Sequence, residues 1–264
     1  MPRKIKKKPE PKPSNEGKII LIVTGILLAV IAVFLIILAI VQNVGKKNED
    51  TDKRETSTTV SQISQTASST DTSTSSTVER PSEAYMDSVT LDMTKTYYAD
   101  INVKDYGKIT VELNYEAAPT TVRNFIYLTE SGFYNGLTFH RIMDGFMMQG
   151  GDPQGNGLGG SEHNIYGEFS ANGWTNSISH TKGVISMARN SYDMNSASSQ
   201  FFIVQSDDHT GSLDGQYAAF GHVTEGLELV DKICHDAKPT DNNGTIPADQ
   251  QPVIESITIR AVDK

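Results

Sequence analysis

The chain has 264 residues, a net charge of −9 at neutral pH and a single cysteine, Cys234, which excludes a small domain held together by disulfides. Its only basic cluster is residues 1–18, where seven Lys and Arg side chains against two Glu give +5. Residues 19–45 carry no charge, so residues 46–264 carry −14. We therefore expect no nucleic-acid partner, because binding phosphates requires a basic face on the folded part.

Residues 19–44 are predicted to form a transmembrane helix. They contain an apolar run of about 23 residues, which at ~1.5 Å per residue is long enough to cross a hydrocarbon core of about 30 Å. A cleaved signal peptide has an apolar region of only about 7–15 residues followed by small residues, and a buried core helix is the other, weaker alternative. The basic flank 1–18 predicts a cytoplasmic tail, a single-pass signal anchor in the lipid bilayer, and an extracellular remainder.

Residues 45–95 are predicted to be a disordered linker. Their central part, residues 56–77, consists mostly of Ser and Thr and cannot bury enough apolar surface to offset the entropy lost on ordering. The linker is either a stalk that holds a domain away from the bilayer or a connection with no specific role.

Residues 96–264 show the periodicity of a folded domain. Two alternating segments separated by Asp105, Tyr106 and Gly107 predict a hairpin over residues 97–113. Apolar residues at helical spacing predict helices over residues 118–132 and 227–235. Short apolar or alternating runs predict six further strands, at residues 137–142, 146–149, 183–188, 200–205, 218–223 and 253–260. Many short strands with two helices indicate a closed or nearly closed antiparallel β structure.

Generic catalytic and metal-binding motifs are missing from this domain. Residues 155–160 fit the glycine pattern of a dinucleotide site, but no helical pattern follows them. The six histidines have neither the spacing nor the cysteine partners of a metal site. Cys234 falls within a helical pattern and is interpreted as a buried structural thiol. The sequence therefore predicts no metal and no cofactor.

One dense block, FHRIMDGFMMQGGD at residues 139–152, resembles the hallmark of the cyclophilin-type peptidyl-prolyl isomerases. Further matching blocks follow in the family's order, at residues 165–168, 183–188, 199–203, 213–215 and 220–223. The resemblance covers most of residues 97–264. It implies a mainly β fold, a closed eight-stranded antiparallel barrel with two capping helices.

The resemblance also implies site residues for isomerisation without a covalent intermediate. Arg141 and Gln149 would be catalytic, with Arg141 donating to the prolyl nitrogen and Gln149 orienting it. The substrate-binding residues would be Phe146, Met147, Ala188, Arg189, Gln200, Phe202, Leu213 and Tyr217. From the residues alone, two other interpretations stay open: Phe146, Met147 and Phe202 as barrel core, and Arg141 as a member of a structural ion pair.

The chain departs from the family pattern at two positions near the site. Ser212 stands where many members have tryptophan, which weakens the expected binding of cyclosporin, and Tyr217 stands where histidine is common. The loop at residues 189–198 is longer than the common form, which could change substrate preference. Trp174 is interpreted as structural.

Anchor, linker and domain together predict a membrane-bound prolyl isomerase that helps exported, proline-containing polypeptides to fold outside the cytoplasm. A single anchor, a long linker and no disulfides suit the surface of a Gram-positive bacterium. Two alternatives use the same fold without catalysis, a peptide-binding chaperone and a surface adhesin.

Overall fold

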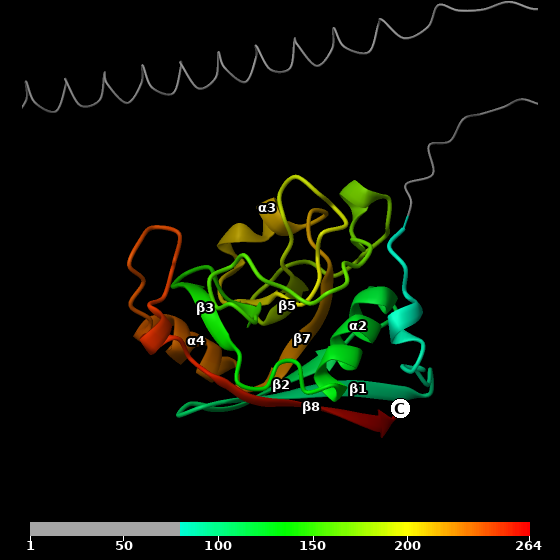
Figure 1. Cartoon of the computed structure of the whole chain (residues 1–264), viewed down its shortest axis with the longest axis horizontal. Helices are drawn as coiled ribbons and strands as arrows, with labels where there is room; N and C mark the ends of the chain where they lie inside the picture. Colours follow the sequence, from blue (N-terminus) through cyan, green and yellow to red (C-terminus); the bar gives the residue numbers. More distant parts are fainter. Residues whose placement is uncertain (1–79) are drawn as a thin grey trace, which may run out of the picture. The chain divides into compact units, whose positions relative to one another are not determined.

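The computed structural model of the chain describes residues 80–264 (Figure 1). The predicted tail, 1–18, and transmembrane helix, 19–44, lie outside the described residues, as does most of the predicted linker. Within residues 80–264, no helix combines the length and the apolar character that crossing a membrane requires.

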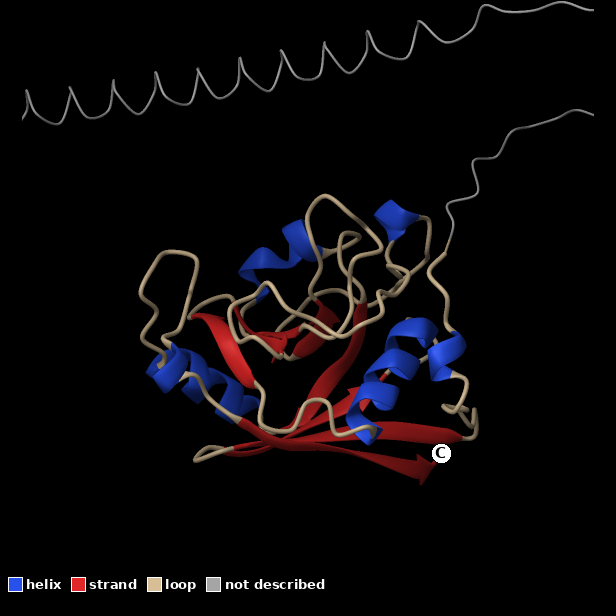
Figure 2. Ribbon diagram, viewed as in Figure 1, coloured by secondary structure: helices blue, strands red, loops and turns tan. Residues whose placement is uncertain are grey.

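Eight antiparallel strands form one strongly curved sheet, in the order β3-β4-β6-β5-β7-β2-β1-β8 (Figures 1 and 2). Their bounds are β1 Lys95–Val103, β2 Gly107–Leu113, β3 Thr138–Met143, β4 Met147–Asp152, β5 Val184–Met187, β6 Phe201–Val204, β7 Ala219–Glu225 and β8 Ile254–Asp263. Each strand overlaps one of the eight segments that the sequence predicts. The prediction of a mainly β, eight-stranded antiparallel fold is therefore confirmed.

The sheet closes into a barrel only in part. The two outermost strands, β3 and β8, are joined by one bridge, between Thr138 and Val253. Two backbone bonds flank it, from Phe139 N to Pro252 O at 2.9 Å and from Ile254 N to Leu137 O at 2.8 Å. Pro252 has no N–H to donate, which limits a ladder at this point. The predicted closed barrel is thus a curled sheet with a narrow seam.

The two predicted helices are present, together with shorter helical segments. The α-helices are α2 Pro119–Glu130, α3 Thr210–Leu213 and α4 Leu227–Asp236, and the 3-10 turns are η1 Ala84–Met86, η2 Ser170–Asn172, η3 Asp207–His209 and η4 Ala248–Gln250. On α4 the buried residues are Val230, Ile233 and Cys234, spaced to lie on one face. Cys234 is 1% exposed and burial raises its pKa to about 12, as expected for a structural thiol. The one-turn α3 was not predicted.

Aromatic rings fill the interior of the curled sheet. Phe125 from α2 meets Phe201 of β6 edge to face at 5.6 Å and lies 5.2 Å from Phe220 of β7. Phe139 of β3 packs edge to face on Phe201 at 6.0 Å. These contacts tie α2 to β6 and β7, and β3 to β6, so that the sheet forms a rigid base for the outward-facing site.

The folded domain begins earlier than the predicted boundary at residue 96. Residues in the last part of the predicted linker, 45–95, pack on α2: Met86 is fully buried and Val89 is 7% exposed. Arg123 of α2 donates to the Met86 carbonyl oxygen at 3.0 Å. The assignment of this part to a disordered linker is wrong, because α2 offers an apolar and charged surface that the linker composition does not reveal.

Candidate active site

Nine of the ten predicted site residues line one cavity of about 140 Å³, called the slot below. They come from β3, β4 and the turn between them, β6, α3, and the segments after β5 and α3. The nine are Arg141, Phe146, Met147, Gln149, Ala188, Arg189, Phe202, Leu213 and Tyr217. The fold therefore brings together residues spread over more than seventy positions of the sequence.

The floor of the slot is apolar and separate from the barrel core. Met147, Phe202 and Leu213 are 1%, 4% and 5% exposed and belong to a small second cluster outside the core. Their strand neighbours Met148 and Ile203 point the other way, into the core, because successive side chains on a strand alternate between its faces. Met147 and Phe202 are thus not barrel core. The slot is shaped to hold a compact apolar ring.

Arg141 of β3 projects to the rim of the slot and is held by neutral acceptors. Its Nε donates to the Asn243 carbonyl oxygen at 2.7 Å, its Nη1 to Gln149 Oε1 at 3.1 Å, and its Nη2 lies 3.2 Å from the Met143 sulfur. Burial lowers the pKa of Arg141, but arginine still stays protonated near neutral pH. Among residues 80–264, no carboxylate forms an ion pair with it. Its charge is therefore available to a ligand in the slot.

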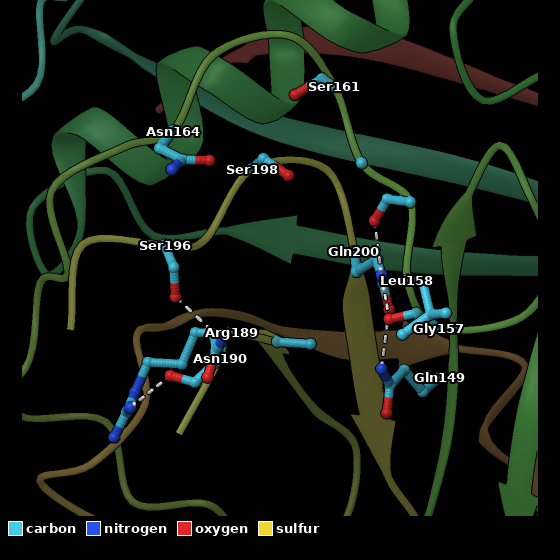
Figure 3. A pocket seen from close by; sticks show the side chains of 13 residues that line it. Gln149, Gly157, Leu158, Ser161, Asn164, Arg189, Asn190, Ser196, Ser198 and Gln200 are labelled. Atoms are coloured by element: carbon cyan, nitrogen blue, oxygen red, sulfur yellow. Dashed lines mark hydrogen bonds between the residues drawn. The ribbon is translucent and has the colours of Figure 1, made fainter. Parts of the chain in front are cut away.

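Gln149 links Arg141 to the tenth predicted residue, Gln200. Gln149 Nε2 donates to Gln200 Oε1 at 2.9 Å, and Gln200 Nε2 donates to the carbonyl oxygens of Gly159 at 2.7 Å and Gly157 at 3.1 Å (Figure 3). This chain of bonds fixes the side-chain amide of Gln149. The oxygen of that amide, Oε1, can then orient the Arg141 guanidinium, as the resemblance implies.

Gln200 lies beside the slot and lines an adjoining cavity of about 550 Å³, called the groove below (Figure 3). Gln149, Ala188 and Arg189 line both cavities, so the two are continuous. Apart from the exposed Leu158, the other residues of the groove wall are small or polar, namely Gly157, Gly159, Gly160, Ser161, Asn164, Asn190, Ser196 and Ser198. Such a surface suits an extended peptide backbone more than large apolar side chains.

Tyr217 and Arg189 form a further part of the slot wall. The Tyr217 ring lies perpendicular to Phe202 at 5.8 Å, and the Arg189 guanidinium lies 5.0 Å from the Tyr217 ring. Ser212 is exposed on α3, and its hydroxyl donates to the His209 carbonyl oxygen at 2.8 Å. As a serine it adds no aromatic surface beside the slot.

Trp174 lines neither cavity, and its indole donates to the Ala117 carbonyl oxygen at 2.9 Å.

Sequence reasoning missed three contributors to the site. His209 packs against Phe146 with ring centroids 4.2 Å apart. Asn243 and Met143 supply acceptors to Arg141. His209, in η3, and Asn243, in a loop, lie more than sixty residues from their partners, so no local pattern predicts them. Only Met143 carried a signal, because it lies two residues from Arg141 on the same strand.

Behind Phe202, a serine, a histidine and an aspartate form a hydrogen-bonded row. His180 Nδ1 lies 2.8 Å from Asp214 Oδ1, and its Nε2 lies 2.9 Å from Ser186 Oγ. The same order of groups activates a nucleophile in hydrolases. Here Ser186 and His180 are 0% and 1% exposed and line neither cavity. The row therefore supports the slot floor, with the His180 ring stacked on Phe202 at 6.1 Å.

The free energy of unfolding is expected to fall as pH is lowered from 7 to 5, because His180 takes up a proton on unfolding. Burial lowers the pKa of His180 below its ordinary value of 6.5, although Asp214 opposes the shift. Between the folded and unfolded pKa values the unfolded chain binds more protons, so stability rises with pH there. One histidine contributes at most about 1.4 kcal/mol per pH unit.

Urea denaturation at pH 7 and pH 5 measures this effect. His180→Gln should show a shallower pH dependence than the parent chain, while the exposed His222→Gln should keep the parent's slope. Equal slopes for His180→Gln and the parent would contradict the assignment.

Comparison with known proteins agrees with the geometry. The family model for cyclophilin type peptidyl-prolyl cis-trans isomerases matches residues 98–263. A peptidyl-prolyl cis-trans isomerase of Helicobacter pylori is 43% identical over 156 residues, covering 58% of this chain and 90% of that protein. Peptidyl-prolyl cis-trans isomerase B of Bacillus subtilis is 46% identical over 127 residues, covering 48% of this chain and 83% of that protein.

Among solved structures, a cyclophilin type isomerase of Cryptosporidium parvum, crystallised in the presence of the dipeptide Ala-Pro, superposes with a TM-score of 0.54. It is 30% identical, and the match covers 62% of this chain and 98% of that one.

Proposed function

This chain belongs to the family of cyclophilin-type peptidyl-prolyl cis-trans isomerases and is such an isomerase, and from that premise we propose that Arg141 catalyses the rotation of prolyl bonds held over the slot. The observation that carries this proposal is the position of the Arg141 guanidinium, at the rim of an apolar cavity and bound only by neutral acceptors. The proline ring would occupy the floor formed by Met147, Phe202 and Leu213. The Ala-Pro dipeptide used with the Cryptosporidium relative supports a substrate of this chemistry.

The reaction is accelerated by a hydrogen-bond donor placed at one atom, the prolyl nitrogen. Resonance in the peptide bond sets a rotation barrier of about 18–20 kcal/mol, and unaided prolyl bonds take tens to hundreds of seconds to convert. When the bond is twisted, conjugation is lost and the lone pair is localised on the prolyl nitrogen. A donor at that nitrogen interacts more strongly with the twisted state than with the planar one, and this difference is what accelerates the reaction.

Arg141 and Gln149 divide this work. The Arg141 guanidinium offers several donors in one plane, and its bond to Gln149 at 3.1 Å fixes that plane. Gln149 would also contact the substrate backbone, while Gln200, Ala188 and Arg189 would contact the residues that precede the proline. Twisting the amide requires neither a covalent bond to the enzyme nor a proton transfer.

The proposal extends to where the enzyme acts. The apolar run in residues 19–44 and the basic flank 1–18 support an anchor with a cytoplasmic N-terminus. The isomerase domain would then lie on the outer face of the cell membrane, at the end of a Ser/Thr-rich linker. Its substrates would be newly exported polypeptides whose folding waits on a prolyl bond, in a Gram-positive bacterium.

Protease added to intact, wall-stripped cells tests this location. We expect the domain at residues 96–264 to be released or digested, while an epitope tag placed before residue 1 stays protected until the membrane is permeabilised. A cytoplasmic protein in the same cells serves as the control for lysis. Protection of the domain in intact cells would contradict the proposed location.

A further inference from the structure

Residues 80–89, the junction segment, lie in the last part of the predicted linker and pack on α2, beside residues that support the groove. We infer that this segment positions the groove walls, and that Tyr85 is a positioning residue for the peptide residues that precede the proline. The inference rests on the proposed use of the slot and groove, and assigns a role in substrate binding to a segment outside the family's matched region, 98–263.

The junction segment is firmly attached to α2. Glu83 accepts hydrogen bonds from Arg123 Nη1 at 3.2 Å and from Thr120 Oγ1 at 2.9 Å. Arg123 also donates to the carbonyl oxygens of Met86 at 3.0 Å and Val89 at 3.3 Å. Because these contacts hold the segment on both sides of Tyr85, its ring has a defined place.

Tyr85 reaches one wall of the groove through its hydroxyl group. The hydroxyl donates to Asn124 Oδ1 at 2.9 Å, and Asn124 Nδ2 donates to the Ser198 carbonyl oxygen at 2.6 Å. Asn124 is fully buried, so an unmade bond there would be costly. Burial raises the pKa of Tyr85, which keeps the hydroxyl protonated and able to donate. Ser198 lines the groove two residues before Gln200 (Figure 3).

The ring of Tyr85 reaches the other wall. It stacks on His163 with centroids 4.3 Å apart and planes at 24°. His163 lies in the loop whose members Ser161 and Asn164 line the groove (Figure 3). His163 itself is exposed on its other side, so Tyr85 supplies its aromatic packing. One side chain therefore contacts the supports of both walls.

The junction segment contacts residues that support the groove walls, and it contacts no residue that lines the slot. The hydrogen bond and the ring contacts of Tyr85 reach Asn124, Tyr127 and His163. None of these three residues lines the slot. Loss of Tyr85 should therefore weaken binding of peptide residues that reach the groove, and leave rotation of a prolyl bond in the slot nearly unchanged.

The test compares two peptides with the full-length chain and its variants. One peptide has a single residue before the proline and the other has three. Tyr85→Ala should raise KM for the longer peptide by about 5- to 10-fold, because the groove walls lose the buried hydrogen bond to Asn124 and the ring contact with His163. Its kcat, and both constants for the shorter peptide, should stay within about twofold. Tyr85→Phe, which keeps the ring, should raise KM for the longer peptide by about threefold.

A matched control is Tyr98→Ala, since Tyr98 is also half-buried, donates to a polar side chain, Glu112, at 3.2 Å, and lines neither cavity. It should leave both peptides unaffected. Equal effects of Tyr85→Ala on the two peptides, or unchanged KM for the longer peptide in both Tyr85 variants, would overturn the inference. A parent chain that isomerises neither peptide faster than buffer would instead overturn the proposed function.

Discussion

Replacing Arg141 by alanine is expected to lower kcat/KM for prolyl isomerisation by about 100-fold, as is typical when one donor to a transition-state charge is removed. The variant loses the charged donor that Gln149 holds at the rim of the slot. The slot floor does not depend on this side chain, so peptide binding should change by only a few-fold. Most of the loss should therefore appear in kcat.

A proline-limited refolding assay and a peptide-binding titration measure the two effects separately. Arg141→Lys serves as the matched variant, because it keeps the charge but loses the planar set of donors, and it should fall between the parent and Arg141→Ala. Full activity in Arg141→Ala would exclude the proposed mechanism. A parent chain that binds peptides without accelerating refolding would favour the non-catalytic chaperone.

Replacing Glu168 by alanine is expected to lower the free energy of unfolding by about 3 kcal/mol, from two charge-assisted hydrogen bonds. The residue that precedes α2, Ala118, offers no side-chain cap. Glu168 takes that role from a distant loop, accepting from the backbone nitrogens of Thr120 and Thr121 at 2.9 Å each. Its carboxylate is fully buried, and burial raises its pKa, so desolvation offsets part of the gain from these bonds.

Urea denaturation of the two chains measures this difference. Glu130→Ala is the matched control, because Glu130 is an exposed glutamate at the other end of the same helix. A carboxylate near a helix C-terminus gains no stabilisation from the helix dipole. This control should therefore leave the free energy of unfolding within about 0.5 kcal/mol of the parent's. Equal effects of the two substitutions would show that Glu168 does not cap α2.

The strands could be predicted because each has apolar residues at strand spacing, but their ends could not. Strand β4 was expected to stop at Gln149 and in fact continues through Gly150 and Gly151 to Asp152. Glycine carries no side chain that marks a strand. Gly150 is required here by close packing, since a Cβ atom would lie 2.9 Å from the Phe139 ring.

Elements that depend on distant partners left little trace in the sequence. The one-turn helix α3 is too short for a periodic pattern. Met86 and Val89 form no recognisable motif within a polar stretch, and they are buried only because α2 lies beside them. In each case the stabilising surface comes from elsewhere in the chain, which local reasoning does not supply.

The residues that line the slot could be predicted from the sequence, but the contacts that hold them in place could not. The resemblance named Arg141, Gln149 and the residues of the slot floor, and the structure places them together. It did not indicate that Asn243 holds the guanidinium, or that His180 underlies Phe202. These contacts join loops to strands at positions that no spacing rule connects.

The seam between β3 and β8 leaves the strand that carries Arg141 with fewer backbone pairs than the strands that carry Met147 and Phe202. Arg141 lies on β3, whose outer edge is paired at single bridges with Val253 and Thr245 instead of with a full strand. Two residues of the slot floor, Met147 and Phe202, lie on β4 and β6, which are paired on both sides. Local opening costs least where the fewest backbone bonds must break. The outer edge of β3 should therefore be the first part of the sheet to open during local unfolding, before the strands that carry Met147 and Phe202.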